Sequence, residues 1–145
     1  MSPVRRLDHV AIIVRDTESA LAFFRDGLGL SVVSTEEVTS TRARLTYLDL
    51  GNAYLQLVEP LDEDSPIYSH LERFGEGVHH IGLGVDDVVE EVAALAPDQT
   101  YSLASGRGRR AVFLPGDAPH NVRVEFTDFD LDEDVISSDG WLPRE

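Results

Sequence analysis

The sequence predicts an α+β fold made of two copies of one βαβββ module. At an offset of 71 residues, His9 aligns with His80 and Asp16 aligns with Asp87, within matching apolar stretches. Each copy opens with a short β-branched run, continues with residues at helical spacing, and ends with further strand-like runs. Self-similarity over half of a 145-residue chain indicates one duplicated module within a single domain rather than a repeat array.

The first module is expected over residues 7–60. Its helix should cover 15–30, with Asp16 or Thr17 as the N-terminal cap. The Gly-Asn pair at 51–52 is typical of a tight hairpin between the last two strands of the module. Alternating or β-branched apolar runs predict its strands over 7–14, 31–38, 43–50 and 53–60.

The second module is expected over residues 78–129 and opens with a strand and a helix over 78–95. The linker at 61–77 carries a short amphipathic helix and ends in a Gly-Glu-Gly turn. The tail at 130–145 is acidic and has few residues suited to a core. The remaining strands of the module are expected near 100–105 and over 110–117 and 121–129.

The composition excludes several classes of partner. The chain has 12 Lys and Arg against 27 Asp and Glu, a formal net charge of −15, whereas nucleic acids and anionic membranes bind basic faces. No apolar run reaches the roughly 18 residues that span a bilayer, and no apolar signal-peptide core is present. Without cysteine there is no disulfide or thiolate chemistry. We therefore expect a cytoplasmic protein that binds a small-molecule substrate, with no nucleic acid and no membrane as partner.

Polar residues interrupt apolar strands at equivalent places in the two modules. Each module has one histidine in its first strand, His9 or His80, and one oxygen-bearing side chain in its last, Gln56 or Glu125. A polar side chain on a buried strand face needs a partner or a ligand. Two imidazoles, an amide oxygen and a carboxylate suit an octahedral divalent ion such as Co, Mn, Ni, Fe or Zn, with positions left for water or substrate. The set of four therefore predicts a catalytic metal site.

These residues also have structural interpretations. A single histidine in a strand is commonly a hydrogen-bonded core residue or lies on the solvent face. His79 directly precedes His80, and since side chains alternate along a strand the two should point to opposite faces. The register of the repeat selects His80 as the ligand. His79 is then expected to be structural, for example paired with a carboxylate.

Three stretches carry a family resemblance: LDHVAIIVRDTESALAFFRDGLGL at 7–30, YLQLVEPLDEDSPI at 54–67 and FGEGVHHIGLGVDDV at 74–88. They resemble the vicinal oxygen chelate (glyoxalase/bleomycin resistance/dioxygenase) superfamily and, within it, the methylmalonyl-CoA epimerases. The resemblance implies a cupped mixed sheet in which the paired modules surround the metal, often in a homodimer. The ligands that it implies are His9, Gln56, His80 and Glu125.

The same resemblance implies an isomerase that removes a proton next to the carbonyl group of an acyl-CoA thioester. The metal would stabilise the negative charge of the enolate that forms. Glu125 would serve both as a metal ligand and as the base that takes the proton. A metal-dependent epimerase is therefore the leading hypothesis for this chain.

Two departures from the epimerase pattern favour other enzymes of the same fold. Epimerases carry a second glutamate in the strand that matches RARLTYLDL, where this chain has Ala43 and Arg44, and Glu36 and Glu37 are poor substitutes. The final hairpin reads FLPGD at 113–117 instead of a His-Pro-Lys turn. A glyoxalase-type lyase or a natural-product biosynthetic enzyme is the second hypothesis. A non-enzymatic, resistance-type binding protein is the third, and the intact ligand set argues against it.

Arginines are the candidates for binding an anionic group of the substrate. SGRGRR at 105–110 concentrates three arginines, among them Arg107 and Arg109, and is either an anion clamp or a solvated turn. Arg42 and Arg44 share one side of their strand. They bind a carboxylate if that side faces the cup and are surface residues otherwise. Arg42, Arg44, Arg107 and Arg109 are thus the predicted substrate-binding set.

Overall fold

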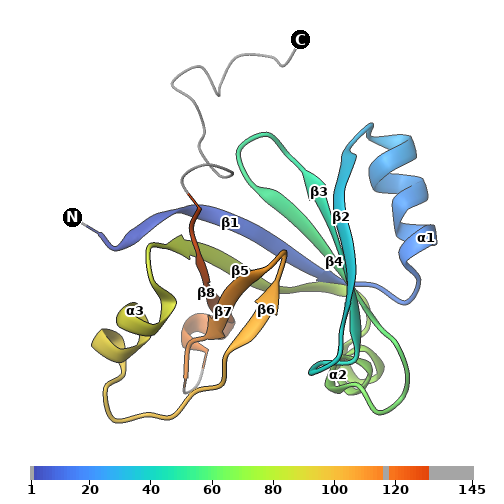
Figure 1. Cartoon of the computed structure of the whole chain (residues 1–145). Coiled ribbons are helices and arrows are strands. Elements are labelled where there is room, and N and C mark those ends of the chain that lie inside the picture. Colours follow the sequence, from blue (N-terminus) through green and yellow to red (C-terminus); the bar gives the residue numbers. More distant parts are fainter. Residues whose placement is uncertain (1, 116–117, 131–145) are drawn as a thin grey trace.

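The computed structural model describes residues 2–115 and 118–130, which form one curved mixed sheet with helices on its outside (Figure 1). The strand order in the sheet is β2-β3-β4-β1-β5-β8-β7-β6. The strands are β1 (Val4–Ile13), β2 (Ser31–Val38), β3 (Ala43–Asp49), β4 (Tyr54–Pro60), β5 (Gly77–Val85), β6 (Ala104–Gly106), β7 (Arg109–Phe113) and β8 (Val124–Asp128). The helical elements are α1 (Thr17–Leu21), a π-helical turn (Ala22–Gly27), α2 (Pro66–Phe74), α3 (Val88–Leu95) and a 3-10 turn (Pro119–Asn121).

The two halves of the sheet are arranged alike about its centre. β1 runs parallel to β4, and β5 runs parallel to β8, so each half pairs its first strand with its last. β1 and β5 pair antiparallel and join the halves. The sheet curls into a cup (Figure 1), and β6 at one end contacts β2 at the other. The predicted α+β fold of duplicated βαβββ modules with a cupped mixed sheet is confirmed.

Equivalent caps begin the first helix of each half. The carboxylate of Asp16 accepts a hydrogen bond from the backbone N–H of Ser19 over 2.9 Å. Asp87 accepts from the backbone N–H groups of Val89 and Glu90 at the start of α3. Such caps satisfy amide donors that have no acceptor within the helix. Of the two caps expected, Asp16 or Thr17, the structure has Asp16, and Asp87 is its equivalent in the second half.

The first helix differs from the one expected over 15–30. α1 ends at Leu21, and the chain continues as a π-helical turn in which the N–H of Leu28 donates to the carbonyl of Phe23 over 2.9 Å. The wider turn changes which side chains face the sheet, and Leu28 is 57% exposed. The strand expected near 100–105 is β6, and β1 begins earlier than predicted, at Val4.

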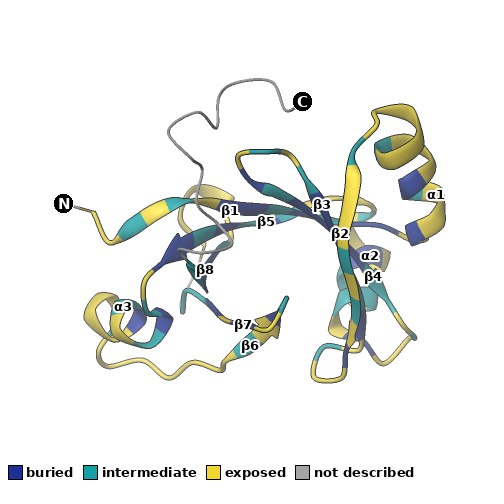
Figure 2. Ribbon diagram, turned by 45° about the horizontal axis from the view of Figure 1, so that its top comes forward, coloured by how far each residue is buried: buried dark blue, intermediate teal, exposed yellow. Residues whose placement is uncertain are grey.

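Side chains alternate between the inside of the cup and its outside, as the pleat of a sheet requires. In β4, Gln56 faces the cavity, while Leu55 and Leu57 pack beneath α1. In β8, Glu125 faces the cavity, while Phe126 packs with residues of α3. Figure 2 shows the buried residues along the sheet and the exposed ones on the outer sides of the helices. Apolar packing outside the sheet therefore holds the strands, and the inside combines an apolar cluster that includes Leu45 and Val58 with a few polar groups.

In the part of the chain that the structure describes, no helix combines the length and the apolar character needed to cross a membrane. The acidic tail predicted at 130–145 lies, beyond Asp130, outside the described residues.

Candidate metal centre

His9 and Glu125 lie on either side of Gly82, with which both pair across the sheet. There is no room for a side chain on Gly82, because a Cβ built there would lie 2.5 Å from Nδ1 and 2.7 Å from Nε2 of His9. The imidazole of His9 thus lies directly over the backbone of β5. The close approach of this ring is what requires a glycine.

Gln56 and His80 lie on either side of Ala11, with which both pair. The amide nitrogen of Gln56 donates to the hydroxyl of Tyr47 over 2.7 Å. The amide oxygen of Gln56 is buried and has no hydrogen-bond partner among the described residues. A buried acceptor without a donor is unfavourable unless something else satisfies it. A cation in the cavity would do so.

Ligand atoms of three residues converge in the cup. Nε2 of His9 is 3.1 Å from Nε2 of His80 and 3.3 Å from Oε1 of Glu125. Oε2 of Glu125 is 3.6 Å from Nε2 of His80, and the three groups offer atoms within 4.8 Å of one another. Two nitrogen ligands at about 2.1 Å and at right angles on one ion would be about 3.0 Å apart. The residues present therefore fit a divalent cation, and Gln56, which lines the same cavity, is the candidate for a fourth ligand.

Asp8 and His79 precede the two histidines, and each contacts the ring that follows it. Oδ2 of Asp8 is 2.7 Å from Nδ1 of His9, and Nδ1 of His79 is 2.8 Å from Nδ1 of His80. The β1–β5 pairing shifts register at both places, and such a bulge brings consecutive side chains to the same side of a strand. The expectation that His79 points to the opposite face is therefore wrong, and His79 lines the cavity.

Burial dominates the electrostatics of the site. Burial raises the pKa of Glu125, against the effect of His9, and burial lowers the pKa of His80, to which the nearby His9 adds. Burial alone would also raise the pKa of Asp8, but the hydrogen bond from His9 and the charge of Arg107 outweigh it, so that this pKa is lowered. Without metal, burial thus disfavours the charged forms of both His80 and Glu125, and a cation in the cavity would act in the opposite direction on Glu125.

A cavity of about 80 Å³ opens on these residues. Among the described residues that line it, Glu125 is the only carboxylate. Ala43 occupies the region where the resemblance places a second glutamate, and it is completely buried. Glu36 accepts a hydrogen bond from the backbone N–H of Arg107, and Glu37 accepts one from Arg44, so neither carboxylate enters the cavity. The rest of the wall is mainly apolar and includes Leu45, Val58, Ile67 and Phe113.

Arg42 and Arg44 lie outside the cup, which resolves the two interpretations that the sequence left open. Arg42 precedes β3 and has a half-exposed side chain. Arg44 lies on the face of β3 opposite Tyr47 and donates to Glu37 and Glu59. Arg44 is directed outward because the inner face of β3 belongs to the odd-numbered positions, and Arg42 pairs with Asp62 at the surface.

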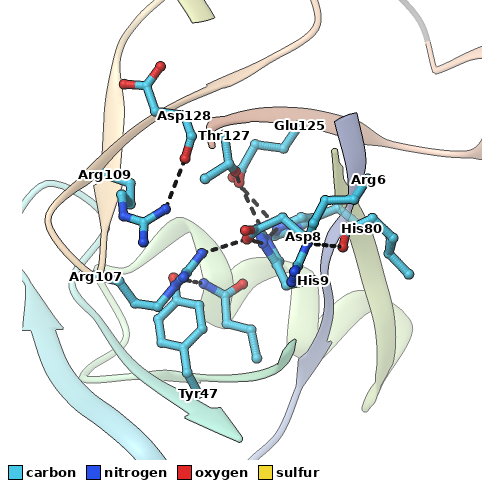
Figure 3. A network of polar contacts seen from close by, with 12 residues as sticks. Arg6, Asp8, His9, Tyr47, His80, Arg107, Arg109, Glu125, Thr127 and Asp128 are labelled. Carbon is cyan, nitrogen blue, oxygen red and sulfur yellow. Dashed lines mark hydrogen bonds and ion pairs between the residues drawn. The ribbon is translucent and has the colours of Figure 1, made fainter. Parts of the chain in front are cut away.

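Arg107 and Arg109 are mostly buried but do not line the cavity either. Nη1 of Arg109 donates to the backbone carbonyl of Asp128 over 3.1 Å. Nη2 of Arg107 donates to Oδ2 of Asp8 over 2.6 Å, as Figure 3 shows. Substrate binding by these two arginines stays a prediction, and their contacts in the structure are with the protein itself.

Sequence reasoning missed three residues that contact or accommodate the candidate ligands: Asp8, Tyr47 and Gly82. Asp8 had a usable signal, because it is an acidic residue beside His9 in an apolar strand and aligns with His79 at the offset of the repeat. Gly82 had a weaker one, since a glycine inside a strand often marks a close approach. Nothing in the sequence distinguishes Tyr47 from an ordinary core aromatic residue.

The duplicated, cupped fold and its inner cluster of histidine, glutamine and glutamate define a class of protein that comparison with known families identifies. Residues 8–126 match the Glyoxalase/Bleomycin resistance protein/Dioxygenase superfamily. The chain belongs to this superfamily.

Its relatives include methylmalonyl-CoA epimerases, as the sequence motifs predict. The chain is 37% identical to the ethylmalonyl-CoA/methylmalonyl-CoA epimerase of Cereibacter sphaeroides, over 77% of this chain and 88% of that protein. It is 34% identical to the human mitochondrial methylmalonyl-CoA epimerase over 75% of this chain, and it spans 65% of the length of the human protein. The solved structure of Streptomyces coelicolor methylmalonyl-CoA epimerase in complex with 2-nitronate-propionyl-CoA superimposes with a TM-score of 0.80 at 29% identity, covering 86% of this chain and 97% of that one.

Proposed function

We propose that this chain is a metal-dependent epimerase or isomerase that removes a proton next to a carbonyl group, with an acyl-CoA of the methylmalonyl-CoA kind as its substrate. The observation that carries the proposal is the convergence of His9, His80 and Glu125 beside the unpartnered amide oxygen of Gln56. This cluster lies inside a cup whose fold is shared with methylmalonyl-CoA epimerases.

The proposed ligands are His9, Gln56, His80 and Glu125, and the ion is one of Co, Mn, Ni, Fe or Zn. Bound there, a divalent ion supplies Lewis-acid stabilisation of negative charge on a substrate oxygen. The protein contributes the orientation of both imidazoles, through Asp8 at His9 and His79 at His80. The mainly apolar wall lowers the local polarity of the cavity, which strengthens electrostatic interactions inside it.

Glu125 is the proposed base. It is the one carboxylate on the cavity wall in the described part of the chain, and Oε1 accepts a hydrogen bond from the hydroxyl of Thr127 over 2.9 Å. This bond holds the carboxylate while it faces the cavity. A proton taken from the substrate carbon would pass to a carboxylate oxygen of Glu125. Its return to the same face would give exchange alone, and epimerisation needs a proton delivered to the opposite face.

A second candidate function follows from the same single carboxylate. Epimerisation through two bases needs a group on each face of the substrate, and Ala43 leaves one face without a carboxylate. A glyoxalase-type lyase or isomerase, or a natural-product biosynthetic enzyme, can move a proton with one base. The ligand set disfavours the third hypothesis, a non-enzymatic binding protein.

The test is proton exchange in D₂O. One isomer of methylmalonyl-CoA, incubated with the Co²⁺-loaded protein, should incorporate deuterium at the α-carbon, followed by NMR, and should epimerise. Glu125→Gln should slow both processes by about 10²- to 10⁴-fold, the usual contribution of a general base. Glu37→Gln, a matched change of an exposed glutamate, should leave them unchanged.

Each other outcome has a meaning. Deuterium incorporation without epimerisation would favour one-base chemistry and direct the search to a panel that includes a hemithioacetal. Exchange that survives both chelation and Glu125→Gln would refute the proposed function. The homodimer and the cytoplasmic location are further proposals, which light scattering of the purified protein and fractionation of the source cells would test.

A further inference from the structure

The hairpin between β6 and β7 connects the second half of the chain to the first. Its loop, Arg107-Gly108, has φ angles of 53° and 71°, as a two-residue type I′ turn requires. The backbone N–H of Arg107 donates to Oε1 of Glu36 in β2 over 2.6 Å. The tip is therefore anchored at the seam where β6 contacts β2 and the cup closes.

The side chain of Arg107 extends from this tip into the first half of the molecule (Figure 3). It is 7% exposed, and its guanidinium carbon lies 4.9 Å and 4.2 Å from the ring centroids of Tyr47 and Tyr54. Nη2 donates to Asp8, a carboxylate that is fully buried. A buried carboxylate is strongly unfavourable without a cation or several donors. Arg107 supplies that cation, and the two tyrosine rings hold the guanidinium in place.

Through these contacts Arg107 reaches two of the four proposed ligands. Asp8 accepts the Nδ1 proton of His9, which fixes the tautomer and leaves Nε2 with a lone pair for the cavity. Tyr47, beneath the guanidinium, accepts the amide N–H of Gln56, which turns the amide oxygen away from this bond. His9 and Gln56 both belong to the first half, whereas the group that supports their partners comes from the second.

The residue before Arg107 contributes as well. Gly106 lies against the hydroxyl of Tyr47 so closely that a Cβ on it would clash. The tip thus confines Tyr47 from two sides, by backbone at the hydroxyl and by guanidinium over the ring.

We propose that the tip of this hairpin, Gly106 and Arg107, is a positioning element for the metal site, and that its docking and metal binding stabilise each other. The proposal rests on the metal site of the proposed function. Arg107 acts through Asp8 and Tyr47 and does not touch the ion or the substrate. Because linkage is reciprocal, metal must strengthen docking of the tip by the factor with which the docked tip strengthens metal binding.

The experiment is calorimetric titration of the metal-free protein with Co²⁺. Arg107→Ala should weaken Co²⁺ binding by about 10- to 100-fold, which is the usual effect of mutating residues that support metal ligands through hydrogen bonds. Arg107→Lys, which keeps the charge, should recover part of the affinity. The matched control is Arg5→Ala, because Arg5 forms a bidentate pair with Asp86 on the surface and should not affect binding.

Two further measurements separate positioning from general stability. If Arg107 acts through Asp8, Asp8→Asn combined with Arg107→Ala should bind Co²⁺ little worse than Asp8→Asn alone. Hydrogen exchange of the amides at 105–109 should slow when Co²⁺ binds. Glu36→Gln weakens the anchor of the tip without uncovering a buried charge, so it tests the proposal even if Arg107→Ala does not fold.

The inference would be overturned if Arg107→Ala or Glu36→Gln bound Co²⁺ with wild-type affinity and if Co²⁺ did not change the hydrogen-exchange rates of the amides at 105–109. A wild-type protein that binds no Co²⁺ would instead refute the metal site of the proposed function, and the inference with it. The two failures are therefore distinguishable in one set of titrations.

Discussion

Replacing Gly82 by alanine should damage the metal site while leaving the fold intact. The new Cβ would lie 2.5 Å from Nδ1 of His9 and closer still to Cε1, against an ordinary contact of 3.4 Å or more, so the ring must move by more than about 0.9 Å. Such a shift disturbs the 2.7 Å bond from His9 to Asp8 and the 3.1 Å approach to His80 together. We expect Co²⁺ affinity to fall by at least about 10- to 100-fold, the effect of losing the support of a ligand. Overpacking should also lower the free energy of unfolding by about 1–3 kcal/mol.

The matched control is Gly84→Ala, two residues further along the same strand. A Cβ on Gly84 would meet Cγ of Arg6 at 3.5 Å, an ordinary contact, so this variant changes the same residue type without crowding a ligand. Titration with Co²⁺ and chemical unfolding of both variants would separate loss of the site from loss of stability. Equal Co²⁺ affinity for the two variants would refute the reasoning, because His9 would then not depend on the space over Gly82.

Three further predictions concern the supports of the site. Tyr47→Phe leaves the amide nitrogen of Gln56 without its acceptor, which should lower the free energy of unfolding by about 1–3 kcal/mol and weaken Co²⁺ binding; unchanged affinity would exclude a role for this bond. Burial lowers the pKa of His79 to about 3, below its value in the unfolded chain. Between about pH 6.5 and 3 the unfolded state therefore binds more protons than the folded state, so acidification over this window should destabilise the metal-free protein. The expected loss is about 2 kcal/mol, which allows for the partial exposure of the His79 side chain. His79→Gln should flatten this dependence in urea titrations, and an unaltered slope would contradict the assignment. Asp87→Ala removes the cap of α3 and should lower the free energy of unfolding by about 1 kcal/mol without altering Co²⁺ affinity. A change in Co²⁺ affinity in this variant would show that loss of stability alone weakens metal binding.

The repeat was the most informative feature of the sequence, for a physical reason. A duplicated module must place its first and last strands at equivalent positions, so a polar residue that recurs in an apolar strand marks the inside of the shared cup. His9 and His80 recur at a constant offset, and Gln56 and Glu125 recur in the last strands. The structure brings these four residues together without any being adjacent in sequence. The fold and the candidate ligands could therefore both be predicted.

The contacts around the ligands could not be predicted, because they depend on irregular geometry. Strict alternation placed His79 on the wrong face, and the bulge that overrides alternation has no signature in the sequence. The face of β3 that carries Arg44 depends on the register of the sheet, which residue spacing alone leaves open. Arg107 reaches Asp8 only because the sheet curls until β6 contacts β2, a tertiary effect across 99 residues of chain.

Duplication also left the two halves chemically unequal at the residue that precedes each histidine. His9 follows Asp8, a buried carboxylate compensated by Arg107, whereas His80 follows His79, a neutral ring whose pKa is far below physiological pH. A carboxylate partner makes an imidazole a stronger metal ligand than a neutral partner does. Of the two imidazoles, His9 should therefore be the stronger ligand of an ion in this cavity, and His80, with only a neutral partner, the weaker one.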